Sequence, residues 1–290
     1  MKQMLFSIIT SLWLTTMGLA GCQSQSQQIT AGYKSVFPYT LKADESHSMP
    51  KELKEISGIT FVEGQSNILY AIQDEEGVLF SYDLRKKQVI ATNAFAKKGD
   101  YEEITTDNHY FYVLKSNGDI YSFPIGSSSY ATEVIINKSL VPTAEYESMA
   151  FDPSSGNLFL LCKVCKVDKK GQHVSGYILQ IGNQGKLTYK GNFNLSIDAL
   201  TALDQRIKKT FKPSAMARHT ASNEWYILSS IDQSLVITDD TFRPKEIVRL
   251  PRKDFEQPEG LAFDAEGNLY ISSEAGTQKH GMVYKYNRIR

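Results

Sequence analysis

Three glutamates occupy the same position in a short motif that recurs five times along the 290-residue chain. The copies read ISGITF, YEEITT, YESMAF, PSAMAR and PEGLAF, and their aligned column is Ser57, Glu102, Glu147, Ser214 and Glu259. Successive copies lie 45, 45, 67 and 45 residues apart, so one unit alone is stretched. Carboxylates at equivalent positions of a repeat would meet wherever the repeats converge.

Converging carboxylates need neutralising, because two of them about 6 Å apart repel by about 3 kcal/mol at an effective dielectric constant of about 20. A hard divalent cation with oxygen ligands, calcium above all, would neutralise Glu102, Glu147 and Glu259. Protein cations such as Lys212 and Arg218, or protonation, are the other routes. The structural alternative is that each glutamate accepts backbone N–H bonds from the next repeat and clasps the two repeats together. Further acids stand two positions upstream, at Glu55, Asp100 and Glu145.

Repeats of this length are typical of a β-propeller, in which the innermost strands begin at the mouth of a central channel. The pattern of each unit predicts four short strands, in which apolar residues are continuous or alternate with polar ones. Turns rich in Gly, Asn, Asp and Ser separate these strands. We therefore predict an all-β fold, a propeller of five four-stranded blades, with six blades less favoured. The fifth unit lacks a fourth strand, and we expect the N-terminal segment VFPYTLK, residues 36–42, to supply it and close the ring.

The stretched unit contains an insertion, LSIDALTALDQRIKKTF, at residues 195–211. Leu200, Leu203, Ile207 and Phe211 recur there at helical spacing. We predict one short amphipathic helix. It would be either a decorated loop that packs on the propeller, or a lid over the channel or a docking helix.

Other polar positions carry weaker signals. His219 aligns with three aspartates and is predicted to begin a turn rather than to act as a general base. Cys162 and Cys165 fit either a local disulfide or two unpaired thiols, because residues three apart on a straight strand face opposite sides. A second column ends the second strands, and we expect it at the opposite end of the sheets from the glutamates: Asp74, Ser116, Lys163, Ser230 and Glu274.

The N-terminus has the features of a secretory signal peptide over residues 1–21, with a lysine at position 2 and an apolar run that follows it. Leu19-Ala20-Gly21-Cys22 looks like a bacterial lipobox, which predicts cleavage before Cys22 and lipidation of its sulfur. Residues 22–34 are predicted to be a flexible tether and residues 35–290 a single propeller domain. We therefore expect a protein of the bacterial cell envelope, periplasmic or outer-membrane associated, that is anchored to the membrane by lipid.

Charge and motifs exclude several classes of function. The chain has 32 basic and 32 acidic side chains and a formal net charge of zero, which argues against nonspecific nucleic-acid binding. It contains no GxSxG elbow, P-loop or dinucleotide fingerprint.

The segments LKEISGITF, GDYEEIT, YESMAFDP, KPSAMARH and QPEGLAFDAEGNLYISSEAG resemble the SdiA-regulated family of β-propeller proteins. The resemblance runs from about residue 35 to the end of the chain. It implies a bacterial envelope protein, in some members calcium-responsive and compared with phytase-like propellers, with no assigned catalytic residues to carry over.

Three functions are compatible with this sequence. The favoured one is a membrane-anchored lipoprotein whose propeller binds a ligand, an ion or a protein partner, with calcium at the central channel. The second is a metal-dependent hydrolase of phosphate esters or lactones that holds calcium with Glu102, Glu147 and Glu259. The third is a structural envelope protein in which the acidic column only locks blades together.

Overall fold

The computed structural model describes residues 37–40, 42–126, 131, 133–168 and 172–289. The chain divides into two units, residues 1–34 and residues 35–290. The predicted signal peptide, Cys22 and the tether of residues 22–34 all lie outside the described residues, so these remain predictions.

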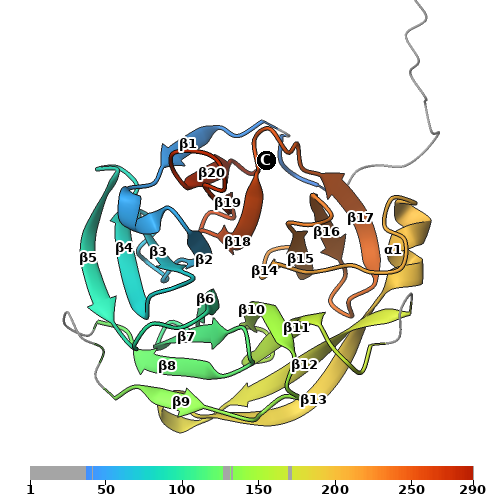
Figure 1. Cartoon of the computed structure of the whole chain (residues 1–290), viewed down its shortest axis with the longest axis horizontal. Coiled ribbons are helices and arrows are strands. Elements are labelled where there is room, and N and C mark those ends of the chain that lie inside the picture. The colour runs from blue at the N-terminus through green and yellow to red at the C-terminus, as the bar shows by residue number, and fades with distance from the viewer. Residues whose placement is uncertain (1–36, 41, 127–130, 132, 169–171, 290) are drawn as a thin grey trace, which may run out of the picture. The chain divides into compact units, whose positions relative to one another are not determined.

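Residues 35–290 form five four-stranded antiparallel sheets arranged as blades around a central channel (Figure 1). This confirms the predicted five-bladed, all-β propeller. Blade 1 is β2 (Ile56–Thr60), β3 (Ile68–Gln73), β4 (Val78–Asp83) and β5 (Gln88–Ala94); blade 2 is β6 (Tyr101–Thr106), β7 (Tyr110–Lys115), β8 (Ile120–Pro124) and β9 (Ile135–Asn137); blade 3 is β10 (Glu145–Asp152), β11 (Asn157–Val164), β12 (His173–Ile181) and β13 (Leu187–Ser196); blade 4 is β14 (Ala215–His219), β15 (Glu224–Ser229), β16 (Ser234–Thr238) and β17 (Pro244–Arg249); blade 5 is β18 (Gln257–Phe263), β19 (Leu269–Glu274), β20 (Met282–Tyr286) and β1 (Glu45–Ser48).

Blade 5 is completed by the N-terminal strand β1, which pairs antiparallel with β20. An N-terminal strand therefore closes the ring as predicted, but the segment 36–42 was the wrong choice. Its described residues pack beside the blade instead: Tyr39 is 4% exposed and its hydroxyl donates to the Gly267 carbonyl at 2.7 Å. The backbone carbonyl of Pro38 accepts a bond from Ile289 N at 2.8 Å.

The apolar core lies between blades rather than in one central mass. The buried apolar residues form five clusters, and each cluster joins two neighbouring blades. In the cluster between blades 3 and 4, Trp225 stacks on Phe242 with ring centroids 5.0 Å apart. Burial of both faces explains why strands such as β15 and β16 read as continuous apolar runs rather than as alternating ones.

The insertion forms one helix, α1 (Ile197–Leu203), which is shorter than the segment with helical spacing. The Ser196 side chain caps it by accepting a bond from Ala199 N at 3.2 Å. Leu200, Ile207 and Phe211 are buried in the cluster between blades 3 and 4. The helix contacts β12 and β17 and lies at the outer rim of the ring (Figure 1). It therefore packs on the propeller, and the alternative of a lid over the channel is wrong. Two short 3-10 turns, η1 (Lys51–Leu53) and η2 (Asn183–Gly185), complete the elements.

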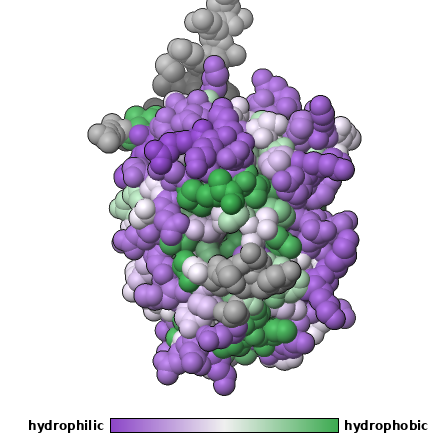
Figure 2. All heavy atoms as spheres, turned by 90° about the vertical axis from the view of Figure 1, so that its left-hand side faces the viewer, coloured by the Kyte–Doolittle hydropathy of each residue, from purple (hydrophilic) through white to green (hydrophobic). Residues whose placement is uncertain are grey.

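One outer side of the ring is partly apolar. Ile90 of β5 and Ile136 of β9 are each 45% exposed, and both strands are outer edges of their sheets. Figure 2, which faces this side, shows apolar atoms gathered between polar borders. This surface lies away from the innermost strands that line the channel.

Candidate functional site

The predicted glutamates all lie at β-bulges in the innermost strands. In β6, Tyr101 pairs with Lys115 and Glu103 pairs with Leu114, so Glu102 has no partner on β7. A bulge adds one residue to one strand and re-aims its side chain. The same skip in the register occurs at Glu147 of β10 and at Glu259 of β18, and β2 skips at Ser57–Gly58. The recurring motif of the sequence is thus a recurring bulge at one end of the channel.

The second polar column lies at the same end as the glutamates, and the expectation of the opposite end was wrong. In an antiparallel hairpin the end of the second strand returns beside the start of the first. Gln257 at the start of β18 accordingly pairs with Glu274 at the end of β19. Ser230 N donates to the Ser214 hydroxyl at 3.2 Å. We call this end of the channel the acidic mouth, formed by Asp74, Glu102, Glu147, Lys163, Glu259 and Glu274.

Blade 3 contributes an ion pair to the acidic mouth. The Lys163 ammonium group contacts Oε1 of Glu147 and lies 3.6 Å from Oε1 of Glu145. The Glu147 side chain is only 9% exposed, and its Oε2 atom is buried without a hydrogen-bond partner. Lys163 therefore satisfies one of the two Glu147 oxygens and leaves the other open.

The remaining glutamates of the mouth hold protons more tightly than usual. Burial, together with the charge of Asp100, raises the pKa of Glu102 to about 8. Burial raises the pKa of Glu259 to about 7, although Lys163 opposes this shift. Burial and the charge of Glu259 raise the pKa of Glu274 to about 8. The carboxylates are thus close enough to repel one another and short of positive charge.

Glu103, one residue beyond the predicted Glu102, is fully buried inside the channel. Its Oε1 atom accepts a bond from Ile104 N at 3.0 Å, while Oε2 has no partner. A Cβ placed on Gly58 of blade 1 would lie 2.5 Å from the same Oε1, so only glycine leaves room for this carboxyl. Burial raises the pKa of Glu103 well above its ordinary value, with the amides of Ile104 and Met216 opposing the shift. Glu103 is not among the residues that the sequence predicted for this site.

Serine hydroxyls join neighbouring blades at this mouth, beside backbone bonds such as that from Tyr101 N to the Asp74 carbonyl at 2.8 Å. Ser57 donates to the Glu102 carbonyl at 2.7 Å, and Ser214 donates to the Pro258 carbonyl at 2.9 Å. The Ser272 hydroxyl donates to the Ser57 carbonyl at 2.8 Å. Ser57 and Ser214 belong to the same column as the glutamates, and Ser214 and Ser230 of blade 4 also hydrogen-bond Glu259 of blade 5.

A preformed metal cage is absent from the part of the chain that the structure describes: no group of three or more His, Cys, Asp and Glu side chains there is arranged to hold a metal ion. The donor chemistry nevertheless fits calcium, which takes six to eight oxygen ligands. Three buried carboxylate oxygens at this end of the channel lack a hydrogen-bond partner: Oδ1 of Asp74, Oε2 of Glu103 and Oε2 of Glu147. A cation would bind by drawing such oxygens together, not by entering a finished site.

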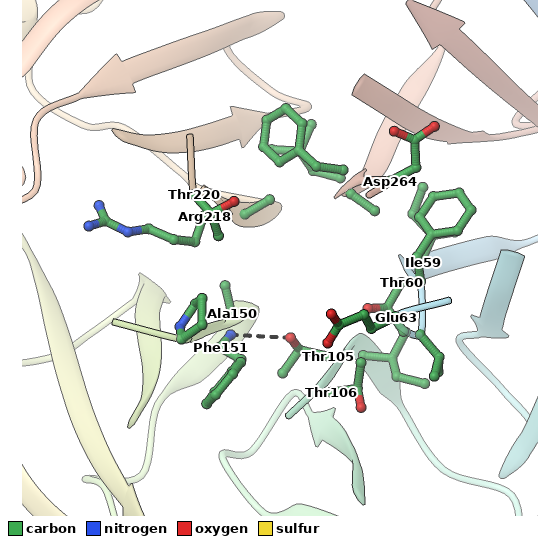
Figure 3. A pocket seen from close by; sticks show the side chains of 18 of the residues that line it. Ile59, Thr60, Glu63, Thr105, Thr106, Ala150, Phe151, Arg218, Thr220 and Asp264 are labelled. Carbon is green, nitrogen blue, oxygen red and sulfur yellow. Dashed lines mark hydrogen bonds between the residues drawn. The ribbon is translucent and has the colours of Figure 1, made fainter. Parts of the chain in front are cut away.

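The opposite mouth of the channel holds a cavity of about 400 Å³ that residues of all five innermost strands line (Figure 3). Its charges are largely satisfied within the protein. Arg218 donates to Asp152 at 3.2 Å, both side chains are 6% exposed, and the guanidinium lies over the Trp225 ring. The sequence offered Arg218 as a cation that could neutralise the glutamates, but Arg218 pairs with Asp152 at the opposite mouth. Lys163 is the cation that contacts a glutamate of the acidic mouth.

The residues that follow the innermost strands at this opposite end are turn residues. The Asp264 carboxylate accepts bonds from the backbone of Glu266 and Asn268 at 3.1 and 2.8 Å. His219 is 2% exposed, and its Nδ1 lies 2.5 Å from the Ser222 hydroxyl at the turn after β14. The prediction that His219 begins a turn is confirmed.

Cys162 and Cys165 form a disulfide, with Cα atoms 5.8 Å apart. Of the two alternatives left by the sequence, the local disulfide is the one observed. It forms because the strand does not run straight: the pairing of β10 with β11 skips from Val164 to Cys162. The disulfide brackets Lys163.

The fold and this mouth define a five-bladed propeller with an acidic channel entrance. The chain belongs to the SdiA-regulated family, whose sequence model matches residues 31–277. Family and fold together support a propeller binding module. No curated protein matches the chain.

The solved structures that share this fold at low identity include two enzymes. The luciferin-regenerating enzyme is 12% identical, with a TM-score of 0.53 over 84% of this chain and 95% of that one. The glutaminyl cyclase of Myxococcus xanthus is 10% identical, with a TM-score of 0.57 over 85% of this chain and 95% of that one. At such identities the likeness shows the fold alone. Among the described residues, no helix is long and apolar enough to cross a membrane.

Proposed function

We propose that this protein is a lipid-anchored module of the bacterial cell envelope whose propeller binds calcium at the acidic mouth and thereby a ligand or protein partner. The observation that carries the proposal is the convergence of bulge-borne, buried carboxylates with an open oxygen on Glu147. Glu102, Glu147 and Glu259 are the ligands we assign, and Glu103 is positioned to add a fourth carboxylate. Calcium fits because it prefers several hard oxygen donors in flexible geometry.

The first prediction concerns calcium. Residues 35–290 hold all five blades and the closing strand, so this unit is suited to thermal melts in calcium and in chelator. We expect free calcium at about 100 times its Kd to raise Tm by about 5 °C or more. The triple variant Glu102→Gln, Glu147→Gln, Glu259→Gln should lose this rise, because amides are weaker ligands for calcium than carboxylates.

A charge-matched control separates binding from general charge effects. Glu63, Glu133 and Glu266 are exposed and lie outside the acidic mouth. Changing these three to glutamine should leave the calcium response intact. An unchanged response in the mouth variant, or none in the wild type, would refute a calcium site at this mouth.

The second prediction concerns the anchor at Cys22. Cells expressing the full chain and labelled with radioactive palmitate should yield a labelled protein that fractionates with membranes, since two or more acyl chains give stable anchoring. The Cys22→Ser variant should carry no label. Equal labelling of both forms would remove the lipid anchor from the proposal.

A metal-dependent hydrolase is the second candidate. Chemistry on phosphate esters calls for cationic groups beside the metal to stabilise the developing charge. Among the described residues of the acidic mouth, Lys163 alone supplies a cation, and Glu147 already engages it. The site is therefore better suited to holding a cation than to turning over an anionic ester.

A further inference from the structure

We infer that Lys163 is a tethered counter-cation, built into the acidic mouth, which a divalent cation must displace in order to bind, and that the Cys162–Cys165 disulfide holds it in place. The inference rests on the proposed function and concerns how that same site is regulated. It makes Lys163 a residue that determines the affinity of the mouth rather than a ligand of it.

The first support is the position of the ammonium group. Lys163 contacts Glu147 and lies 3.6 Å from Glu145, and its side chain is only 19% exposed. A partly buried pair is screened less by solvent than a surface pair. The ammonium group therefore already neutralises the carboxylate whose free Oε2 atom a cation would need.

The second support is that two bulges face one another in blade 3. The pairing of β10 with β11 skips Glu147 on one strand and Lys163 on the other. Each skip re-aims the side chain of the extra residue. Val164, the next residue, is 44% exposed, so the two neighbours diverge and Lys163 is the one turned to the mouth.

The third support is the reach of the charge. Besides its contact with Glu147, the charge of Lys163 acts on Glu102 of blade 2 and on Glu259 of blade 5. Its influence thus extends over all three assigned ligands. Its displacement would leave them mutually repelling unless a cation with at least the same charge took its place.

The fourth support is the disulfide that brackets the lysine. Cys162 is fully buried and Cys165 is 9% exposed, and both belong to the apolar cluster between blades 2 and 3. The link anchors both sides of the Lys163–Val164 dipeptide to the core. A lysine held in this way loses less freedom on pairing than a lysine on an open loop.

The test is calorimetric titration of the 35–290 unit with calcium. The Lys163→Gln variant should bind calcium about tenfold more tightly than the wild type, and in chelator it should melt at a lower temperature because the mouth has lost its counter-cation. Lys166→Gln, which removes an exposed lysine three residues further on, is the matched control and should bind as the wild type does. Equal or weaker binding by Lys163→Gln would overturn the inference.

A second measurement covers the case in which Lys163→Gln does not fold. In protein with ¹³C-methylated lysines, the Lys163 signal, assigned by its absence from the Lys163→Arg variant, should move on calcium titration while other lysine signals stay. A Lys163 signal that ignores calcium would contradict displacement.

The role of the disulfide has its own arm. The double variant Cys162→Ser, Cys165→Ser should bind calcium more tightly than the wild type but less tightly than Lys163→Gln. An affinity equal to that of the wild type would remove the disulfide from the proposal. If wild type and Lys163→Gln bind calcium equally, this inference fails alone, whereas if neither form binds, the proposed calcium site fails and this inference with it.

Discussion

At the scale of the residue, Glu103 differs from the residues that stand directly after the aligned column in the other four motifs. The equivalent positions in the other four motifs hold Gly58, Ser148, Ala215 and Gly260, all of them small. Together they leave room at the channel for one carboxyl, and blade 2 fills it. Burial raises the pKa of this group well above its ordinary value and so favours its protonated, neutral form.

The third prediction follows from that protonation. Glu103→Gln preserves shape, neutrality and the bond from Ile104 N, so its Tm in chelator at pH 7 should match that of the wild type. Glu103→Ala leaves a cavity and an unpaired amide and should lower the free energy of unfolding by about 3 kcal/mol. Chemical denaturation measures both. A loss as large in Glu103→Gln as in Glu103→Ala would show that the ionised form is the one needed.

The sequence predicted part of this site and missed the rest for identifiable reasons. The bulge glutamates were found because the motif repeats them. Glu103 was missed because it does not repeat, although one acid among four small residues was a readable signal. Lys163 was predicted at the wrong end of the channel because the end of the second strand was expected far from the start of the first, whereas an antiparallel hairpin brings the two together.

At the scale of the element, α1 is stabilised by the blades it joins rather than by its own length. A seven-residue helix has little stability alone, so the packing of one face must hold it. Leu200 is fully buried and Leu203 is 44% exposed, within one turn of each other. The helical spacing predicted the buried face, whereas the end of the helix after Leu203 depends on the turn that follows.

The fourth prediction uses this pair as its own control. Leu200→Ala should cost about 3 kcal/mol of unfolding free energy, because it opens a cavity between blades 3 and 4. Leu203→Ala should cost about 0.5 kcal/mol or less, since its side chain is largely in water. Urea denaturation of the two variants checks the difference. Equal costs would mean that α1 does not contribute to that core.

At the scale of the whole molecule, the acidic mouth couples stability to pH. Glu102, Glu259 and Glu274 have pKa values of about 8, 7 and 8 in the folded protein, against an ordinary value of 4.5. Between about pH 4.5 and pH 8 the folded state therefore binds more protons than the unfolded state does. The stability these groups add is fully present below about pH 4.5 and is lost as the pH rises through 7 to 8.

The fifth prediction is the resulting pH profile. In chelator, the Tm of the 35–290 unit should fall by at least about 5 °C between pH 5 and pH 8.5. Calcium should reduce this fall, because it replaces the protons as the neutralising charge. Differential scanning calorimetry across that range provides the measurement. A Tm in chelator that rises over the same interval would contradict the assignment of raised pKa values.

The closing strand makes the order of synthesis matter. Lys285 on β20 pairs with Glu45 on β1 across 240 residues of chain, so blade 5 needs both ends of the propeller unit. Blades 1 to 4 can assemble as the chain emerges, but β1 has no partner until residues 282–286 have been made. Chains truncated before β20 would display unpaired strand edges, which invite aggregation and proteolysis. Only a polypeptide synthesised through β20 can therefore close the ring and pair the edge of β1.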